Sequence, residues 1–286
     1  MKIIRPLSLI VLLLFVGCNN VAEPVEEMTT PVEWKFSVGT ASRTSLGELD
    51  ADNRRPIYWS AGDCIAINGV TSAPLGNLGE GVKYATFSFE KVLIPPYNVI
   101  YPASLYKDES TITLPTRRYT TPEAFEAPMA VCVEEDNVAS LHHICAAIKL
   151  TLVKSHETAF SDKYPIKYVK FEGNNKEQVS GDFGLDYTTQ TLTSLVEAPQ
   201  EGYISDTRVV RTALSCTLTD EPVTLYIIVP AMEYANGFTI KIYNTQGHRM
   251  ACTKSSAVTL APGEIYTLPQ VAYHPTYTEI EVGTGM

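Results

Sequence analysis

The chain has 286 residues, of which 45% are hydrophobic and 19% are charged, and its formal net charge is −10. This composition is typical of a globular protein and excludes a disordered chain. Nucleic-acid binding requires a basic face, so the acidic balance predicts no nucleic-acid partner.

The N-terminus has the pattern of an export signal. Lys2 and Arg5 are the only charges among the first seventeen residues, and residues 7–16 are apolar apart from Ser8. That run covers about ten residues, whereas a transmembrane helix needs about 20. Residues 1–17 are therefore predicted to be a secretory signal peptide.

The end of this signal resembles the lipobox of bacterial lipoproteins, LFVGC at residues 14–18. The resemblance implies cleavage between Gly17 and Cys18, a diacylglycerol on the Cys18 sulfur, and acylation of its amine by a fatty acid such as palmitate. Several acyl chains give stable membrane anchoring. The polar, acidic residues 18–31 contain two prolines and indicate a lipidated linker. What the lipoprotein resemblance implies for location is the cell outer membrane, with the protein either a surface-exposed lipoprotein or part of an assembled surface fibre.

The remaining cysteines are odd in number and form no CxxC motif. Zinc ribbons and thioredoxin-like redox sites are therefore excluded, and most of these cysteines are expected to be small buried residues with their pairing left open. They are Cys64, Cys132, Cys145, Cys216 and Cys252.

Residues 32–38, VEWKFSV, alternate strictly between apolar and polar side chains. Val32, Trp34, Phe36 and Val38 share one parity, which predicts a half-buried strand. A polar segment, residues 39–56, follows it.

The rest of the chain shows the same short, strand-like texture. Prolines exclude a helix across residues 92–104, and no window of twelve or more residues has a helical stripe. Strand patterns recur between turn signals, including a hairpin turning at residues 244–247 and an apolar run at residues 223–231 that predicts a buried strand. This pattern predicts an all-β fold of two β-sandwiches, residues 32–137 and 138–275, with residues 276–286 as a tail.

No catalytic or metal motif is present: GxSxG, P-loop, HExxH and EF-hand patterns are all absent from the sequence. His142 and His143 are adjacent and would face opposite sides of a strand, so they are not expected to share a metal. Asp50 and Asp52 indicate a solvated acidic loop. We expect a protein that is not an enzyme and has no cofactor, although dispersed carboxylates leave a secreted hydrolase as a third hypothesis.

Tyrosines are frequent in the first half and offer an alternative function. Aromatic rings can stack on sugars, but tyrosine is also a good strand residue, and packing is the preferred interpretation. The residues concerned are Tyr97, Tyr101, Tyr106 and Tyr119.

Several stretches, taken in their order along the chain, resemble the fimbrillin-like lipoproteins, which are type V pilus subunits of Gram-negative gut and oral anaerobes. The likeness runs from about residue 31 to residue 273. The stretches are SRT at 42–44, IYWSAGDCIAI at 57–67, IYPAS at 100–104, APMA at 127–130, LHHICAAIKL at 141–150 and GEIYTL at 263–268. The resemblance implies two tandem transthyretin-like β-sandwich domains and polymerisation by donor-strand exchange, in which a protease cuts after an arginine behind the first strand and a strand of the next subunit replaces it.

On this chain the resemblance makes residues 32–38 the displaced strand and Arg43 the candidate processing site, with Arg54 and Arg55 as rivals. Residues 276–286 become either a donor strand or a frayed tail. The leading hypothesis is an outer-membrane lipoprotein that acts in adhesion as a pilus subunit or anchor. Its partners would be other pilus subunits, the membrane, and a host or bacterial surface receptor. The alternative is a monomeric surface glycan-binding lipoprotein.

Overall fold

The computed structural model describes residues 32–38, 45–46, 57–118, 125, 127–135, 138–155, 165–196, 210–274 and 278–282. Within these ranges the regular structure is strand, apart from one 3-10 turn, η1, at Ala103–Leu105. The predicted all-β class is therefore confirmed. No helix in the described ranges is long and apolar enough to cross a membrane. The signal peptide and linker, residues 1–31, lie outside them.

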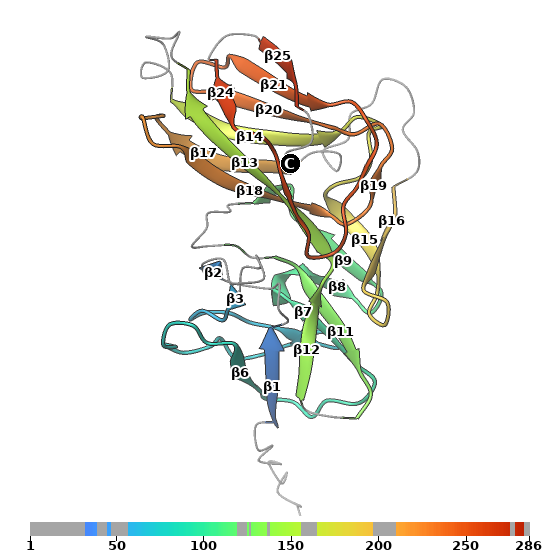
Figure 1. The fold of residues 1–286 in the computed structure, drawn as a ribbon. Coiled ribbons are helices and arrows are strands. Elements are labelled where there is room, and N and C mark those ends of the chain that lie inside the picture. The colour runs from blue at the N-terminus through green and yellow to red at the C-terminus, as the bar shows by residue number, and fades with distance from the viewer. Residues whose placement is uncertain are drawn as a thin grey trace, which may run out of the picture.

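The first sheet has seven strands in the order β5-β4-β7-β11-β12-β1-β6 and forms the lower part of the molecule in Figure 1. Strand β1 is parallel to β12 and antiparallel to β6. A separate short pair, β2 (Ser45–Leu46) and β3 (Ile57–Tyr58), follows β1 in the sequence. The bounds are β1 Val32–Val38, β4 Ala66–Ile67, β5 Val70–Thr71, β6 Tyr84–Phe89, β7 Tyr97–Tyr101, β11 Met129–Val133 and β12 Val138–His143.

The second half contains a six-stranded sheet, β10-β17-β14-β20-β21-β25, and a smaller sheet in which β13 pairs with β18, β23 and β24. A large apolar cluster draws side chains from both sheets. The bounds are β10 Arg117–Arg118, β13 Cys145–Lys154, β14 Ile166–Gly173, β17 Val210–Cys216, β18 Val223–Pro230, β20 Phe238–Asn244, β21 Arg249–Lys254, β23 Ile265–Thr267, β24 Val271–Tyr273 and β25 Thr278–Glu281, with β19 Glu233–Tyr234 paired to β22 Val258–Thr259.

Local patterns explain these strands. In β20 every second residue is buried, as its alternation predicts. The hairpin from β20 to β21 turns where predicted, because the Asn244 carboxamide accepts hydrogen bonds from the backbone N–H groups of Gln246 and His248 and Gly247 takes a left-handed φ of 83°. Residues 225–230 of β18 are all buried, which confirms the predicted buried strand.

The two halves are joined by a fourth sheet, β16-β15-β9-β8, in which strands from both sides of residue 137 pair with each other. Its bounds are β8 Tyr106–Asp108, β9 Thr111–Leu114, β15 Gly181–Asp186 and β16 Thr191–Ser194. Strand β12 belongs to the first sheet, and Ile144 alone separates it from β13 of the second half. The division of the chain into two domains near residue 137 stays a prediction. Strands that precede and follow this residue are hydrogen-bonded to each other, as in the pair of β9 and β15.

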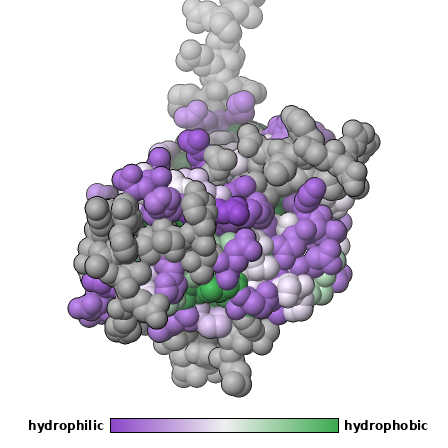
Figure 2. Space-filling model, turned by 90° about the horizontal axis from the view of Figure 1, so that it is seen from above, coloured by the Kyte–Doolittle hydropathy of each residue, from purple (hydrophilic) through white to green (hydrophobic). Residues whose placement is uncertain are grey.

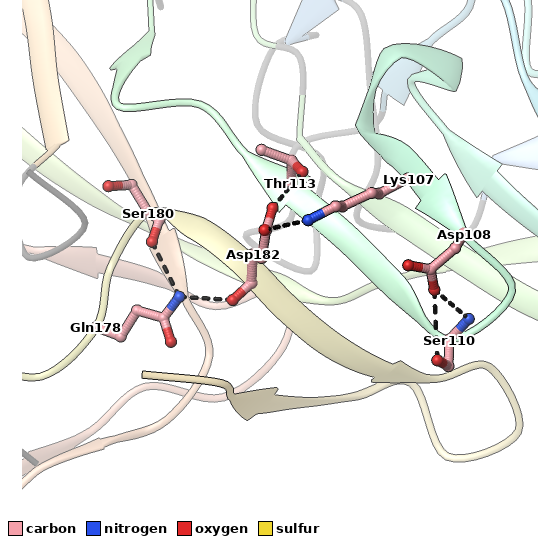
Figure 3. A network of polar contacts seen from close by, with 7 residues as sticks. All are labelled: Lys107, Asp108, Ser110, Thr113, Gln178, Ser180 and Asp182. Carbon is pink, nitrogen blue, oxygen red and sulfur yellow. Dashed lines mark hydrogen bonds and ion pairs between the residues drawn. The ribbon is translucent and has the colours of Figure 1, made fainter. Parts of the chain in front are cut away.

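Polar side chains attach β15 to the first half and hold the β15–β16 hairpin together (Figure 3). Asp182 accepts a hydrogen bond from Thr113 at 2.6 Å and pairs with Lys107 on β8. The buried Gln178 carboxamide donates to the carbonyls of Ser180 and Asp182, at 3.1 and 2.6 Å. Its oxygen accepts from the Ser194 hydroxyl and from the backbone N–H groups of Leu195 and Val196.

The end of the molecule formed by the second half is shown from above in Figure 2. The residues that are coloured on this face are mostly hydrophilic, with a hydrophobic patch among them. This polarity agrees with the acidic composition.

We predict that Gln178→Met lowers the free energy of unfolding by about 2–4 kcal/mol, because it keeps the length of the side chain but removes the hydrogen bonds that the buried carboxamide makes to the backbone of the hairpin. Urea denaturation measures the change. The control is Lys107→Met, which removes an exposed ion pair and should have a much smaller effect. Equal losses in the two variants would contradict the role assigned to Gln178.

Candidate functional site

The candidate site is the position that β1 fills between β12 and β6, which we call the first-strand slot. Register pairs run from Lys35 with Val138 to Val38 with Leu141 on one side, and from Val32 with Phe89 to Ser37 with Tyr84 on the other. Both edges of β1 are therefore hydrogen-bonded. Although β1 is the first strand in the described part of the chain, it lies inside the sheet and not at its border.

The apolar face of β1 enters the core of the first half. Trp34 is 3% exposed and Phe36 is fully buried. The two rings stack at 5.9 Å between centroids, Trp34 meets Tyr97 edge-on at 4.5 Å, and Phe36 meets Phe87 at 6.1 Å. The indole N–H of Trp34 has no hydrogen-bond partner within the described part of the chain, so this residue contributes through packing. Val32 packs at the edge of the cluster, and the side chain of Val38 lies outside the described ones.

The opposite face of β1 makes polar contacts. The Lys35 ammonium lies 5.7 Å from the centroid of the Tyr84 ring. The hydroxyls of Ser37 and Ser140 are 2.5 Å apart, and the Ser37 hydroxyl also donates to the Ala139 carbonyl at 3.4 Å. Apolar contacts on one face of β1 and polar contacts on the other both depend on the pairing register. A shift by one residue would exchange the two faces, so the contacts on both faces fix the register of the strand.

Behind β1 lies the turn of the IYWSAGDCIAI stretch. Trp59 contacts Phe87 at 5.0 Å and Tyr101 at 5.3 Å between ring centroids. The Tyr101 hydroxyl donates to an Asp63 carboxylate oxygen at 3.0 Å, and the other oxygen accepts from the Ser60 N–H at 2.7 Å. Residues of this turn therefore form part of the core that β1 packs against.

The tyrosines of the alternative sugar site do not form an open platform. Tyr101 is 1% exposed. Tyr97 and Tyr106 are half-buried, and Tyr97 contacts Trp34. Tyr119 lies outside the described residues. The three described tyrosines of this set thus pack against the apolar clusters.

The tail forms the border strand of the six-stranded sheet. Strand β25 runs parallel to β21, with Ile280 opposite Cys252. The Val282 N–H donates to the Thr253 carbonyl at 2.7 Å, and its side chain is 4% exposed. A Glu281 carboxylate oxygen accepts from the N–H and hydroxyl of Ser255 at 2.9 and 2.7 Å.

The two histidines face opposite sides of β12, as expected. His142 is exposed and His143 is buried. Burial lowers the pKa of His143 to about 4, because it removes the imidazolium from water. The Pro128 carbonyl faces the ring and raises the pKa in part, but its geometry falls short of a hydrogen bond, and both ring nitrogens lack a partner within the described part of the chain.

Other sequence-based candidates can be located only in part. Gly17, Cys18, Arg43, Arg54 and Arg55 lie outside the described residues. The five remaining cysteines lie in the described ranges and form no disulfide bond with one another. The described ranges contain no group of three or more side chains suited to hold a metal ion.

Comparisons with known proteins point to one kind of fold. No family model and no curated protein matches the chain. Among solved structures, a Bacteroides ovatus protein assigned to cell adhesion aligns with a TM-score of 0.50 and 10% identity, over 88% of this chain and 92% of that one. The tip fimbrial protein Mfa3 of Porphyromonas gingivalis aligns at 0.33 and 8%, over 85% and 97%, and a fimbrial assembly protein of Parabacteroides distasonis at 0.32 and 12%, over 84% and 90%.

The first of these likenesses carries information about the fold alone. At that level it is consistent with the resemblance to fimbrillin-like proteins that the sequence stretches suggested. The two weaker likenesses add no argument.

Sequence reasoning missed several residues that form the slot. Phe87 could have been predicted, because apolar and polar side chains alternate over residues 84–89 and one face of the strand must therefore be apolar. Ser140 could not have been predicted, because no local sequence pattern indicates that residues 138–141 lie beside β1.

We predict that Phe36→Ala lowers the free energy of unfolding by about 3–5 kcal/mol, because it removes a fully buried ring from a packed cluster. Chemical denaturation of the full chain measures the loss. Glu33→Ala, on the exposed side of the same strand, is the control and should change little. A loss below about 1 kcal/mol would contradict the packing role of β1.

We also predict acid sensitivity from His143. Its pKa is about 4 in the folded protein, whereas the ordinary pKa of a histidine side chain is 6.5, so the unfolded chain binds the proton first. This contribution to stability is complete above pH 6.5 and is lost as the pH falls toward 4, by up to about 3 kcal/mol. His143→Phe should flatten stability over this range in denaturation curves, whereas His142→Gln should not. An unchanged slope in His143→Phe would refute the assignment.

Proposed function

We propose that the protein is a cell-surface adhesion component of a pilus, assembled through exchange of its first strand and composed of two tandem transthyretin-like β-sandwich units. The observation that carries the proposal is the position of β1, an N-terminal strand paired on both edges inside a sheet. The fold likeness to a Bacteroides protein assigned to adhesion supports it.

The slot suits strand exchange for a physical reason. A vacant slot leaves the backbone groups of β12 and β6 without partners and uncovers the cluster around Phe87, so it favours entry of another strand. Cleavage after Arg43, or after Arg54 or Arg55, separates β1 from the rest of the chain without cutting a sheet that holds the core.

The lipid would determine which role the subunit plays. If Arg43 is cut, Cys18, its acyl chains and β1 leave together, and the lipid serves only for delivery. If Arg43 stays intact, Cys18 anchors the protein permanently at the outer membrane. A glycan-binding monomer gains no support from the packed tyrosines.

A direct test treats purified precursor with an Arg-specific protease and analyses it on unboiled gels together with a candidate donor subunit. The proposal expects release of the β1 fragment and formation of mixed, denaturation-resistant species. Immunogold labelling of cells separates filament from bare membrane. Persistent retention of β1 with no mixed species would reject polymerisation and leave an anchor.

A disulfide lock gives a sharper prediction. Ser37→Cys with Ser140→Cys should form a bond between β1 and β12, because the two hydroxyls are 2.5 Å apart. The oxidised variant should retain β1 after cleavage and fail to exchange, and a reductant should restore exchange. The matched control is Ser37→Cys alone. Exchange at the normal rate in the locked variant would show that β1 is not the displaced strand.

A further inference from the structure

The first-strand slot is shaped for two large side chains, and this property bears on which strand could replace β1. Trp34 and Phe36 occupy neighbouring inward positions, and each meets an aromatic ring from another strand, Tyr97 or Phe87. Both are almost completely buried, and packed interiors contain few voids. A replacement strand with smaller side chains would leave cavities at both positions.

The chain's own tail does not supply such side chains. Its apolar parity is Thr276, Thr278, Ile280 and Val282. When this parity faces inward, the two large positions receive at most Ile280 and Val282, whichever way the strand runs. Each replacement removes aromatic volume from a cluster that is held in place by its other rings.

The side chains of the opposite parity in the tail would fit the apolar slot even less well. This parity presents Tyr277, Glu279 and Glu281, so a single ring would be accompanied by carboxylates in an apolar core. Buried carboxylates without partners are strongly disfavoured. Neither parity therefore fits, and a shift of register cannot repair this.

The tail also has a place in its own molecule. Its Val282 side chain is buried, its backbone bonds to Thr253, and its Glu281 carboxylate bonds to Ser255. Releasing it would expose the border of β21. The tail would therefore lose its contacts with β21 and would fit poorly in the first-strand slot of another copy.

We propose that the first-strand slot selects a strand from a different protein, one with large apolar side chains at two alternate positions, and rejects the tail of a second copy of this chain. The inference rests on the proposed function. It makes the protein a subunit that accepts a partner's strand and does not accept the tail of its own copies.

The test uses the full mature chain with a site for a specific protease introduced beside Arg43, cut and left with β1 in place. Labelled peptides compete for the slot: the first strand VEWKFSV, the native tail TYTEIEV, and the tail with Ile280→Trp and Val282→Phe. Fluorescence anisotropy reports binding in mild urea, and mass spectrometry identifies the fragment that leaves.

The first-strand peptide should enter, and the double-substituted tail should bind at least about 100-fold more tightly than the native tail. Equal binding of the two tail peptides would overturn the selectivity while leaving strand exchange intact. Failure of all three peptides, including VEWKFSV, would overturn strand exchange itself and this inference with it.

Discussion

The first half of the molecule depends on the insertion of β1 between β12 and β6. One short segment supplies hydrogen bonds to two neighbours and places Trp34 and Phe36 against rings from β6 and β7. Without it, β6 would have no described neighbour in the sheet, because it is the outermost strand. A single element therefore closes both the sheet and the core.

This dependence extends toward the second half through β12. Its first residues pair with β1, its last residues pair with β11, and Ile144 leads directly into β13. Ile144 is 1% exposed and its N–H donates to the Pro128 carbonyl at 3.1 Å, so the connection is fixed by packing and hydrogen bonding. The β9–β15 pairing adds a second link, in which Gln178 and Asp182 hold the hairpin in place. Strand β10 also pairs with β17, so the halves are joined at three points.

The sequence allowed the local part of this arrangement to be predicted. Alternation identified β1 and β20, and the turn residues identified the hairpin after Asn244. The partners of β1 were beyond reach, since β12 lies about 100 residues later and its parallel pairing leaves no local signal. Alternation likewise assigned His142 and His143 to opposite faces, but which face is buried depends on strands brought together by the fold. The pairing of β25 with β21 could not be predicted either, because it is also parallel and leaves no local signal in the sequence.

The energetics of the slot constrain how an exchange could proceed. Removing two large aromatic residues from a core costs about 3–5 kcal/mol each, and a domain is stable by only about 5–15 kcal/mol. Loss of β1 also leaves backbone groups on two strands without partners, which adds to this cost. A subunit with an empty slot would therefore lie close to unfolding and expose a surface prone to aggregation. Exchange must then proceed with the incoming strand pairing stepwise as β1 leaves. Because any strand can satisfy the backbone groups, the choice among incoming strands falls to the side chains at the positions of Trp34 and Phe36.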